Sequence, residues 1–97
     1  MKIQAIGVFW YKDSAQYHDF KKIFADSDKL HIRFSNWKQQ AEKLVKKQES
    51  NGIAVVKAYA EPAEFVAWCR ANGHTIDSKG RAAFANIKAH EYLVSKS

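Results

Sequence analysis

Cysteine is the residue of this chain with the clearest potential for chemistry. The 97 residues include a single cysteine, Cys69. A nucleophilic thiol needs a lowered pKa, which a helix N-terminus or a cationic neighbour supplies. Cys69 falls about two turns inside a predicted helix, on the same side as Phe65, where a small buried hydrophobic residue is the usual occupant. We therefore interpret Cys69 as a buried structural thiol.

The other ligand-type residues do not predict a metal site. The chain has four histidines: His18, His31, His74 and His90. Zinc sites use three or four closely spaced ligands, whereas no histidine pair has His-x3-His spacing and Cys69 with His74 is a lone pair. Asp26 and Asp28 could hold a hard cation, but aspartates after a helix more often bond local amides in a turn. We expect no metal and no cofactor.

Motifs for catalysis and phosphate binding are absent from the sequence. It contains no glycine-rich phosphate loop, no Walker lysine motif and no Gly-x-Ser-x-Gly turn. We therefore expect no catalytic residue and predict that the protein is not an enzyme.

Composition is typical of one globular domain spanning residues 1–97. Hydrophobic residues make up 46% of the chain and aromatic residues 13%, which excludes a disordered chain. No apolar run approaches the roughly 18 residues of a membrane span, and a lone cysteine is typical of the reducing cytoplasm. The formal net charge of +6 suits nucleic acid or an acidic protein, but it also serves solubility.

Apolar periodicity predicts the order strand, helix, helix, strand, helix, helix. The strands are expected at residues 3–11 and 53–60, with the first buried on both faces and Gly7 marking a close approach of another backbone. The helices are expected at 14–25, from Ser35 or Asn36 to the Asn51-Gly52 stop, at 62–72 and from 77 to about 96. The fold class is therefore α/β, with a small two- or three-stranded, mainly parallel sheet covered by about four helices. Residues 29–34 are a loop or an added edge strand.

Several residues predict where these helices begin and end. Asp13 or Ser14 is the N-cap candidate of the first helix, and Pro62 suits the first turn of the third helix. Gly73 is expected to stop that helix, because glycine readily adopts the left-handed conformation after a helix. Asp77 is then the predicted N-cap of the last helix.

A combination of motifs extends from the first strand to the last helix: Phe9-Trp10-Tyr11, Glu61-Pro62-x-x-Phe65-x-x-Trp68-Cys69, Gly73, Asp77, Arg81, Ala82 and Phe84. This combination is similar to a group of small bacterial proteins with no assigned activity. The resemblance covers most of the chain. It implies no reaction, cofactor or catalytic residue.

Aromatic residues at the strand ends are the candidate binding surface. Trp10 and Tyr11 end the first strand, Tyr59 lies near the end of the second, and Tyr17 lies one turn into the following helix. The carboxyl ends of strands in open α/β sheets usually form the ligand site. The alternative is that these rings are core, because so small a sheet needs large rings to bury.

Basic residues offer two candidate nucleic-acid surfaces. The first is the helix face with Lys38, Lys43, Lys46 and Lys47, on which Glu42 and Lys46 have favourable i,i+4 spacing. The second is a helix-turn-helix-like segment at 62–94, in which Lys79, Arg81 and Lys88 could face phosphate. Gly80 and Asp77 oppose the second surface, since glycine weakens a helix and aspartate repels phosphate.

These observations favour a non-catalytic cytoplasmic module that binds another protein or associates with itself. The alternative is a nucleic-acid-binding module that uses one of the two basic surfaces. A small-ligand site around Trp10, Tyr11 and Tyr59 ranks third.

Overall fold

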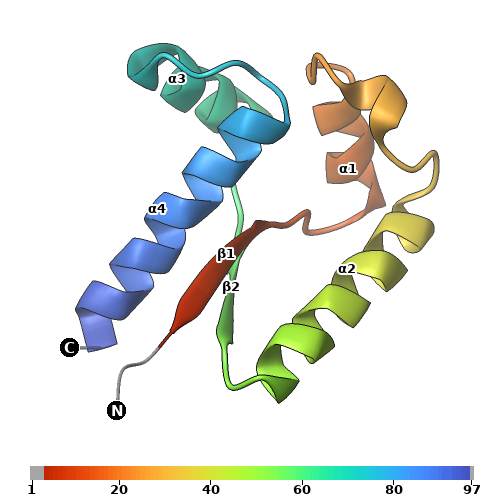
Figure 1. Ribbon diagram of the computed structural model, residues 1–97. Coiled ribbons are helices and arrows are strands. Elements are labelled where there is room, and N and C mark those ends of the chain that lie inside the picture. Colours follow the sequence, from red (N-terminus) through yellow and green to blue (C-terminus); the bar gives the residue numbers. More distant parts are fainter. Residues whose placement is uncertain (1–3, 97) are drawn as a thin grey trace.

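A computed structural model describes residues 4–96 and shows two strands flanked by helices (Figure 1). The elements are β1 (Ala5–Phe9), α1 (Ser14–Lys21), the short 3-10 helix η1 (Ser27–Lys29), α2 (Phe34–Ser50), β2 (Ala54–Ala58), α3 (Pro62–Asn72) and α4 (Ser78–Lys96). β1 and β2 pair in parallel. The predicted α/β fold, with a small parallel sheet covered by four helices, is confirmed.

The register of the two strands sorts their side chains onto two faces. Ile6 pairs with Val55 and Val8 with Lys57, so these four side chains share one face. Gly7 lies on the other face, against α4, where an added Cβ would overlap the carbonyl oxygen of Ala85. The predicted close approach of another backbone at Gly7 is confirmed.

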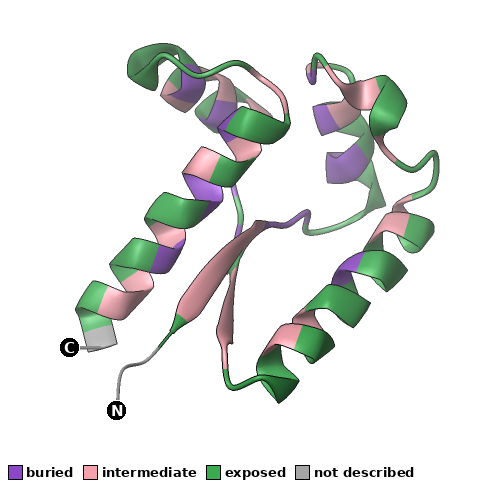
Figure 2. Cartoon of the chain, viewed as in Figure 1, coloured by how far each residue is buried: buried purple, intermediate pink, exposed green. Residues whose placement is uncertain are grey.

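The strands are shorter and less buried than expected. Ile3 lies outside the described residues, and the first four residues of β1 are only partly buried. The prediction of a strand buried on both faces is therefore wrong for β1, because α4 covers one face while α2 lies mainly beside β2 (Figure 2). Residues 29–34 hold the end of η1, a bent loop and the first residue of α2, so the described part of the chain has no third strand.

Two helix boundaries also differ from the prediction. α1 ends at Lys21 rather than at residue 25, because Ile23 and Phe24 both donate to the carbonyl of Phe20 in a turn. The amide of Ala25 then donates to the carbonyl of Ile76, which ties this turn to the α3–α4 connection. α2 begins at Phe34, with Arg33 as an N-cap that makes no side-chain capping bond.

The remaining caps agree with the sequence. The Asp13 carboxylate accepts a hydrogen bond from the Gln16 amide at 2.8 Å and caps α1. Glu61 and Glu64 form a capping box at the start of α3, and Gly73 ends that helix with a φ of 70°. Asp77 accepts a bond from the Lys79 amide at 3.0 Å at the start of α4.

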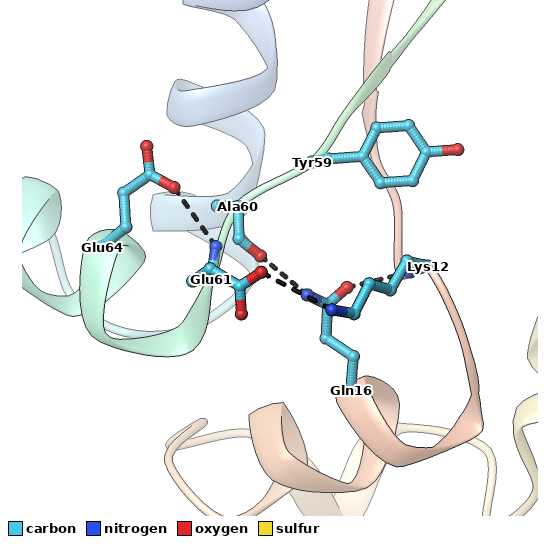
Figure 3. Close-up of a pocket in the computed structure, with 6 residues that line it drawn as sticks. All are labelled: Lys12, Gln16, Tyr59, Ala60, Glu61 and Glu64. Atoms are coloured by element: carbon cyan, nitrogen blue, oxygen red, sulfur yellow. Dashed lines mark hydrogen bonds and ion pairs between the residues drawn. The ribbon is translucent and has the colours of Figure 1, made fainter.

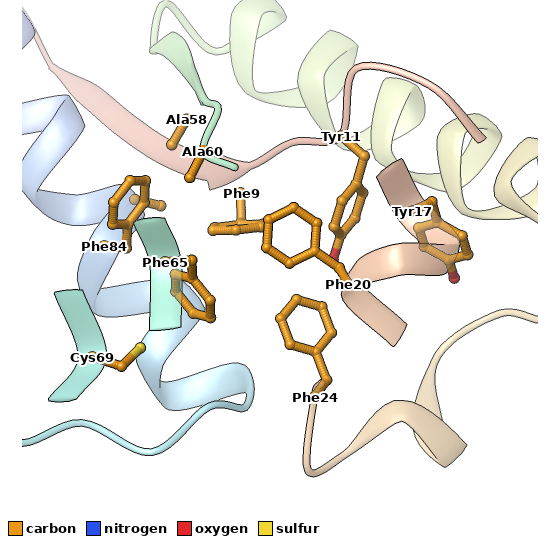
Figure 4. Packing of buried hydrophobic residues seen from close by; sticks show 11 residues of the cluster. Phe9, Tyr11, Tyr17, Phe20, Phe24, Ala58, Ala60, Phe65, Cys69 and Phe84 are labelled. Atoms are coloured by element: carbon orange, nitrogen blue, oxygen red, sulfur yellow. The ribbon is translucent and has the colours of Figure 1, made fainter. Parts of the chain in front are cut away.

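The core lies beyond the carboxyl ends of the strands and consists mainly of aromatic rings (Figure 4). Phe9 at the end of β1 is surrounded by rings from α1, the turn after α1, α3 and α4. These rings are Phe20, Phe24, Phe65 and Phe84. Trp10 and Trp37 pack together beside this cluster, with centroids 5.0 Å apart. Among the described residues, no helix is long and apolar enough to cross a membrane.

Replacing Gly7 with alanine should destabilise the fold by about 3 kcal/mol, because the new methyl group meets backbone and no side chain can move away. Gly52→Ala is the control. Gly52 has a φ of 79° and no heavy atom near an added Cβ, so it should cost about 1 kcal/mol from backbone strain alone. Urea unfolding followed by circular dichroism measures both. Equal losses in the two variants would contradict the close packing of α4 on β1.

Candidate functional site

The carboxyl ends of the two parallel strands border a shallow pocket (Figure 3). Its volume is about 320 Å³ and its lining residues are Lys12, Gln16, Tyr59, Ala60, Glu61 and Glu64. The parallel pairing brings these segments together, because both strands end at the same edge of the sheet. Lys12 and Gln16 follow β1, and the other four residues follow β2.

Gln16 closes the floor of this pocket. Its side-chain amide donates to the carbonyl of Ala60 at 3.1 Å, and its side-chain oxygen accepts from the amide of Lys12 at 2.8 Å. Gln16 is only 5% exposed. These two bonds therefore take the place of the hydrogen bonds to water that its side-chain amide loses on burial. The chains leaving β1 and β2 are thereby held together.

The charged groups of the pocket interact with one another. The Lys12 ammonium lies 3.7 Å from the Glu61 carboxylate, and Glu64 accepts from the Glu61 amide at 3.2 Å. Lys12 and Glu61 are both more than half exposed, so their attraction is weak in energy. The pocket therefore exposes one ammonium and two carboxylates, whose charges partly offset one another, beside the Tyr59 ring.

The four aromatic candidates do not lie together on an open surface. Trp10, Tyr11 and Tyr17 are 4%, 2% and 0% exposed, whereas Tyr59 is 50% exposed. The Tyr11 and Tyr17 rings pack edge to face with centroids 5.0 Å apart. Burial raises the pKa of both hydroxyls above the ordinary tyrosine value. Three of the candidates occupy the interior, as the alternative interpretation of the sequence held, and only Tyr59 is accessible.

The six basic candidates fall into two groups. Lys38, Lys43, Lys46 and Lys47 are exposed along α2. Lys38 pairs with Glu42 at 3.9 Å, in place of the expected pair between Glu42 and Lys46. Lys79 is also exposed at the start of α4. Arg81 differs from all of these, because its side chain is 12% exposed and paired with an acid.

The partner of Arg81 is Asp26, 55 residues earlier in the chain. Two guanidinium nitrogens donate to the two carboxylate oxygens at 2.9 and 2.8 Å. The guanidinium also lies 4.4 Å from the centre of the Phe24 ring. The hydrogen bond from Arg81 holds the pKa of the Asp26 carboxyl below its usual value. The guanidinium that would contact phosphate in a helix-turn-helix is therefore already paired with Asp26.

Close packing between α3 and the start of α4 also buries residues of the 62–94 segment. Gly80 is buried at the start of α4, where an added Cβ would meet the carbonyl of Thr75 and come within 3.0 Å of the Cys69 sulfur. Cys69 itself is fully buried, and burial raises the pKa of its thiol. The described residues contain no cluster of three or more histidine, cysteine, aspartate or glutamate side chains suited to a metal ion.

The sequence analysis missed both the pocket charges and the Asp26–Arg81 pair. Lys12 and Glu61 could have been found, because each follows a predicted strand. Asp26 could not have been paired with Arg81, since nothing local relates two residues so far apart. No protein-family model, curated protein sequence or solved structure matches this chain.

Replacing Asp26 with asparagine should lower the free energy of unfolding at pH 7 by about 3 kcal/mol, because it leaves the Arg81 charge largely buried and unpaired. The folded pKa of Asp26 is depressed, so the pair stabilises the fold above the unfolded carboxyl pKa near 4. That stabilisation is lost as pH falls through the folded pKa. Urea titrations between pH 7 and pH 3 should show the two proteins converging in acid.

Glu91→Gln is the matched control, because it removes an exposed carboxylate that lies 3.8 Å from Lys88. It should change stability by no more than about 0.5 kcal/mol. A constant difference between wild type and Asp26→Asn across the pH range would show that the ion pair does not supply the stabilisation.

Proposed function

We propose that this protein is a cytoplasmic protein-binding module that associates with a second copy of itself along the outer edge of β2. The unpaired edge of a sheet with only two strands is the observation that carries the proposal. Two strands alone rarely suffice for a stable sheet, and a second copy would extend it to four. The single free thiol, Cys69, supports the cytoplasm as the compartment.

The hydrogen bonds between the strands identify which backbone groups face outward. The Ala54 amide donates to the carbonyl of Gln4, and the Trp10 amide donates to the carbonyl of Ala58. Backbone direction alternates along a strand, so Val55, Lys57 and Tyr59 direct their amides and carbonyls away from β1. No hydrogen bond to these groups occurs within residues 4–96. Such an edge is a template for another strand.

The sheet face opposite α4 adds apolar surface next to this edge. We call it the open sheet face, and it consists of Ile6, Val8, Val55, Lys57 and Tyr59. The first three are partly buried, and the last two are exposed. α2 reaches the Trp10 end of the face through Trp37, while Leu44 on the same helix remains 41% exposed. Partial exposure of this kind suits an interface between copies.

The total surface area supports the same partner. The accessible surface is 6430 Å², whereas a compact monomer of this mass exposes about 5,700 Å². The excess of roughly 750 Å² is close to the 800 Å² that each partner buries in a standard interface. The molecule is also flat, with extents of 42 × 31 × 18 Å.

Light scattering and sedimentation at micromolar to millimolar concentrations should give about twice the chain mass of 11.1 kDa. Lys57→Pro should shift the protein to monomer, because proline removes an outward amide from the edge and leaves the bonds to β1 in place. Lys57→Ala is the control, since it removes the same side chain and keeps the amide. It should remain dimeric.

Circular dichroism checks that Lys57→Pro retains its helices. A wild-type protein that is strictly monomeric throughout this concentration range would refute self-association, whatever the variants do. A dimer that persists in folded Lys57→Pro would place the interface elsewhere than the β2 edge.

A further inference from the structure

The outward face of α2 carries lysines and neutral polar residues without any acid. At about 100° per residue, these side chains occupy one arc opposite the line of Trp37, Ala41 and Gln48 that faces the interior. We call this arc the lysine strip. It consists of Ser35, Asn36, Gln39, Gln40, Lys43, Lys46, Lys47 and Ser50, all of them exposed.

The acids of α2 border the strip near Lys46, because Glu42 precedes that residue by four positions and Glu49 follows it by three. Glu42 and Glu49 lie on one flank of the helix, and Glu42 is paired there with Lys38. Within residues 4–96, none of Lys43, Lys46 and Lys47 takes part in an ion pair. The three ammonium groups therefore give the strip a local positive charge, which Glu42 and Glu49 on the adjoining flank offset only in part.

The chemistry of the strip favours phosphate over other anionic partners. It has no aromatic or aliphatic side chain, so it lacks both the anchors of protein hot spots and the apolar residues that insert into a membrane surface. Its amides and hydroxyls are the groups that, with lysine, hydrogen-bond phosphate oxygens in nucleic-acid complexes. The span from Asn36 to Lys47 is about 16 Å, or roughly five base-pair steps.

We propose that the lysine strip of α2 binds the phosphate backbone of duplex nucleic acid without reading its sequence. The strip lies on the opposite side of α2 from the residues that face the interior, so phosphate contact requires no rearrangement of the fold. The charges that support this binding all lie on one helix.

Fluorescence anisotropy with a labelled 20-base-pair duplex tests this binding. Three phosphate contacts per copy predict a slope of about −2.7 in a plot of log K against log salt concentration, or about 40-fold weaker binding at 200 mM than at 50 mM salt. Lys43→Gln, Lys46→Gln and Lys47→Gln combined should weaken binding at 50 mM salt by about tenfold or more and flatten the slope. Arginine at the same three positions should retain both.

The control variant combines Lys22→Gln, Lys29→Gln and Lys88→Gln, which lower the net charge equally at exposed or half-exposed sites on other elements. It should keep most of the affinity. Equal losses in the two glutamine triples would overturn the inference, because binding would then follow net charge alone. Absence of duplex binding at 50 mM salt would also overturn it, as would stronger binding to phosphatidylserine vesicles or to polyglutamate than to the duplex.

Discussion

The ring of Phe9 holds the structure together at the point where β1 ends. Its centroid lies between 4.9 Å and 6.2 Å from those of Phe20, Phe24, Phe65 and Phe84. A sheet of two strands offers too little surface to anchor four helices, so the rings supply the interior that additional strands provide elsewhere. The edge-to-face geometry of most of these pairs lets rings from α1, α3 and α4 meet at one residue. This core occupies the region where larger α/β folds place a ligand, and only a shallow pocket remains there.

Local signals predicted the elements better than they predicted their contacts. Pro62, Gly73 and Asp77 mark helix ends through their own backbone and side-chain chemistry, so the sequence alone located α3 and the start of α4. The turn after α1 is held in addition by the Ala25 amide, which donates to the Ile76 carbonyl, a contact that no local pattern reveals. The same limit applies at Arg81. The sequence cannot distinguish an arginine that contacts phosphate from one that pairs with an aspartate 55 residues away. Of the four aromatic residues predicted for the candidate site, only Tyr59 is accessible. The other three are buried, because a two-stranded sheet supplies too little apolar surface for a core without large rings.

The two sides of the sheet are used differently. On one side α4 packs so closely on β1 that Gly7 has no room for a Cβ, and the face is complete. On the other side α2 contacts the sheet mainly at β2 and near Trp10, which leaves Ile6, Val8 and Val55 partly exposed. The outer surface of α2 then carries lysines rather than balanced charge. The two surfaces for which binding is proposed therefore involve α2 and both strands, because the open sheet face includes Ile6 and Val8 of β1.

Electrostatics separates the two proposed interactions. Copies that each carry a formal charge of +6 repel one another, so added salt should screen that repulsion and strengthen pairing through the largely apolar β2 edge. Phosphate binding responds in the opposite sense, because each lysine contact releases a counterion whose gain in entropy shrinks as salt rises. Lys57 is the one charged side chain of the open sheet face, and its ammonium lies 4.4 Å from the centre of the Trp10 ring. The two proposed interactions are therefore expected to respond to added salt in opposite directions.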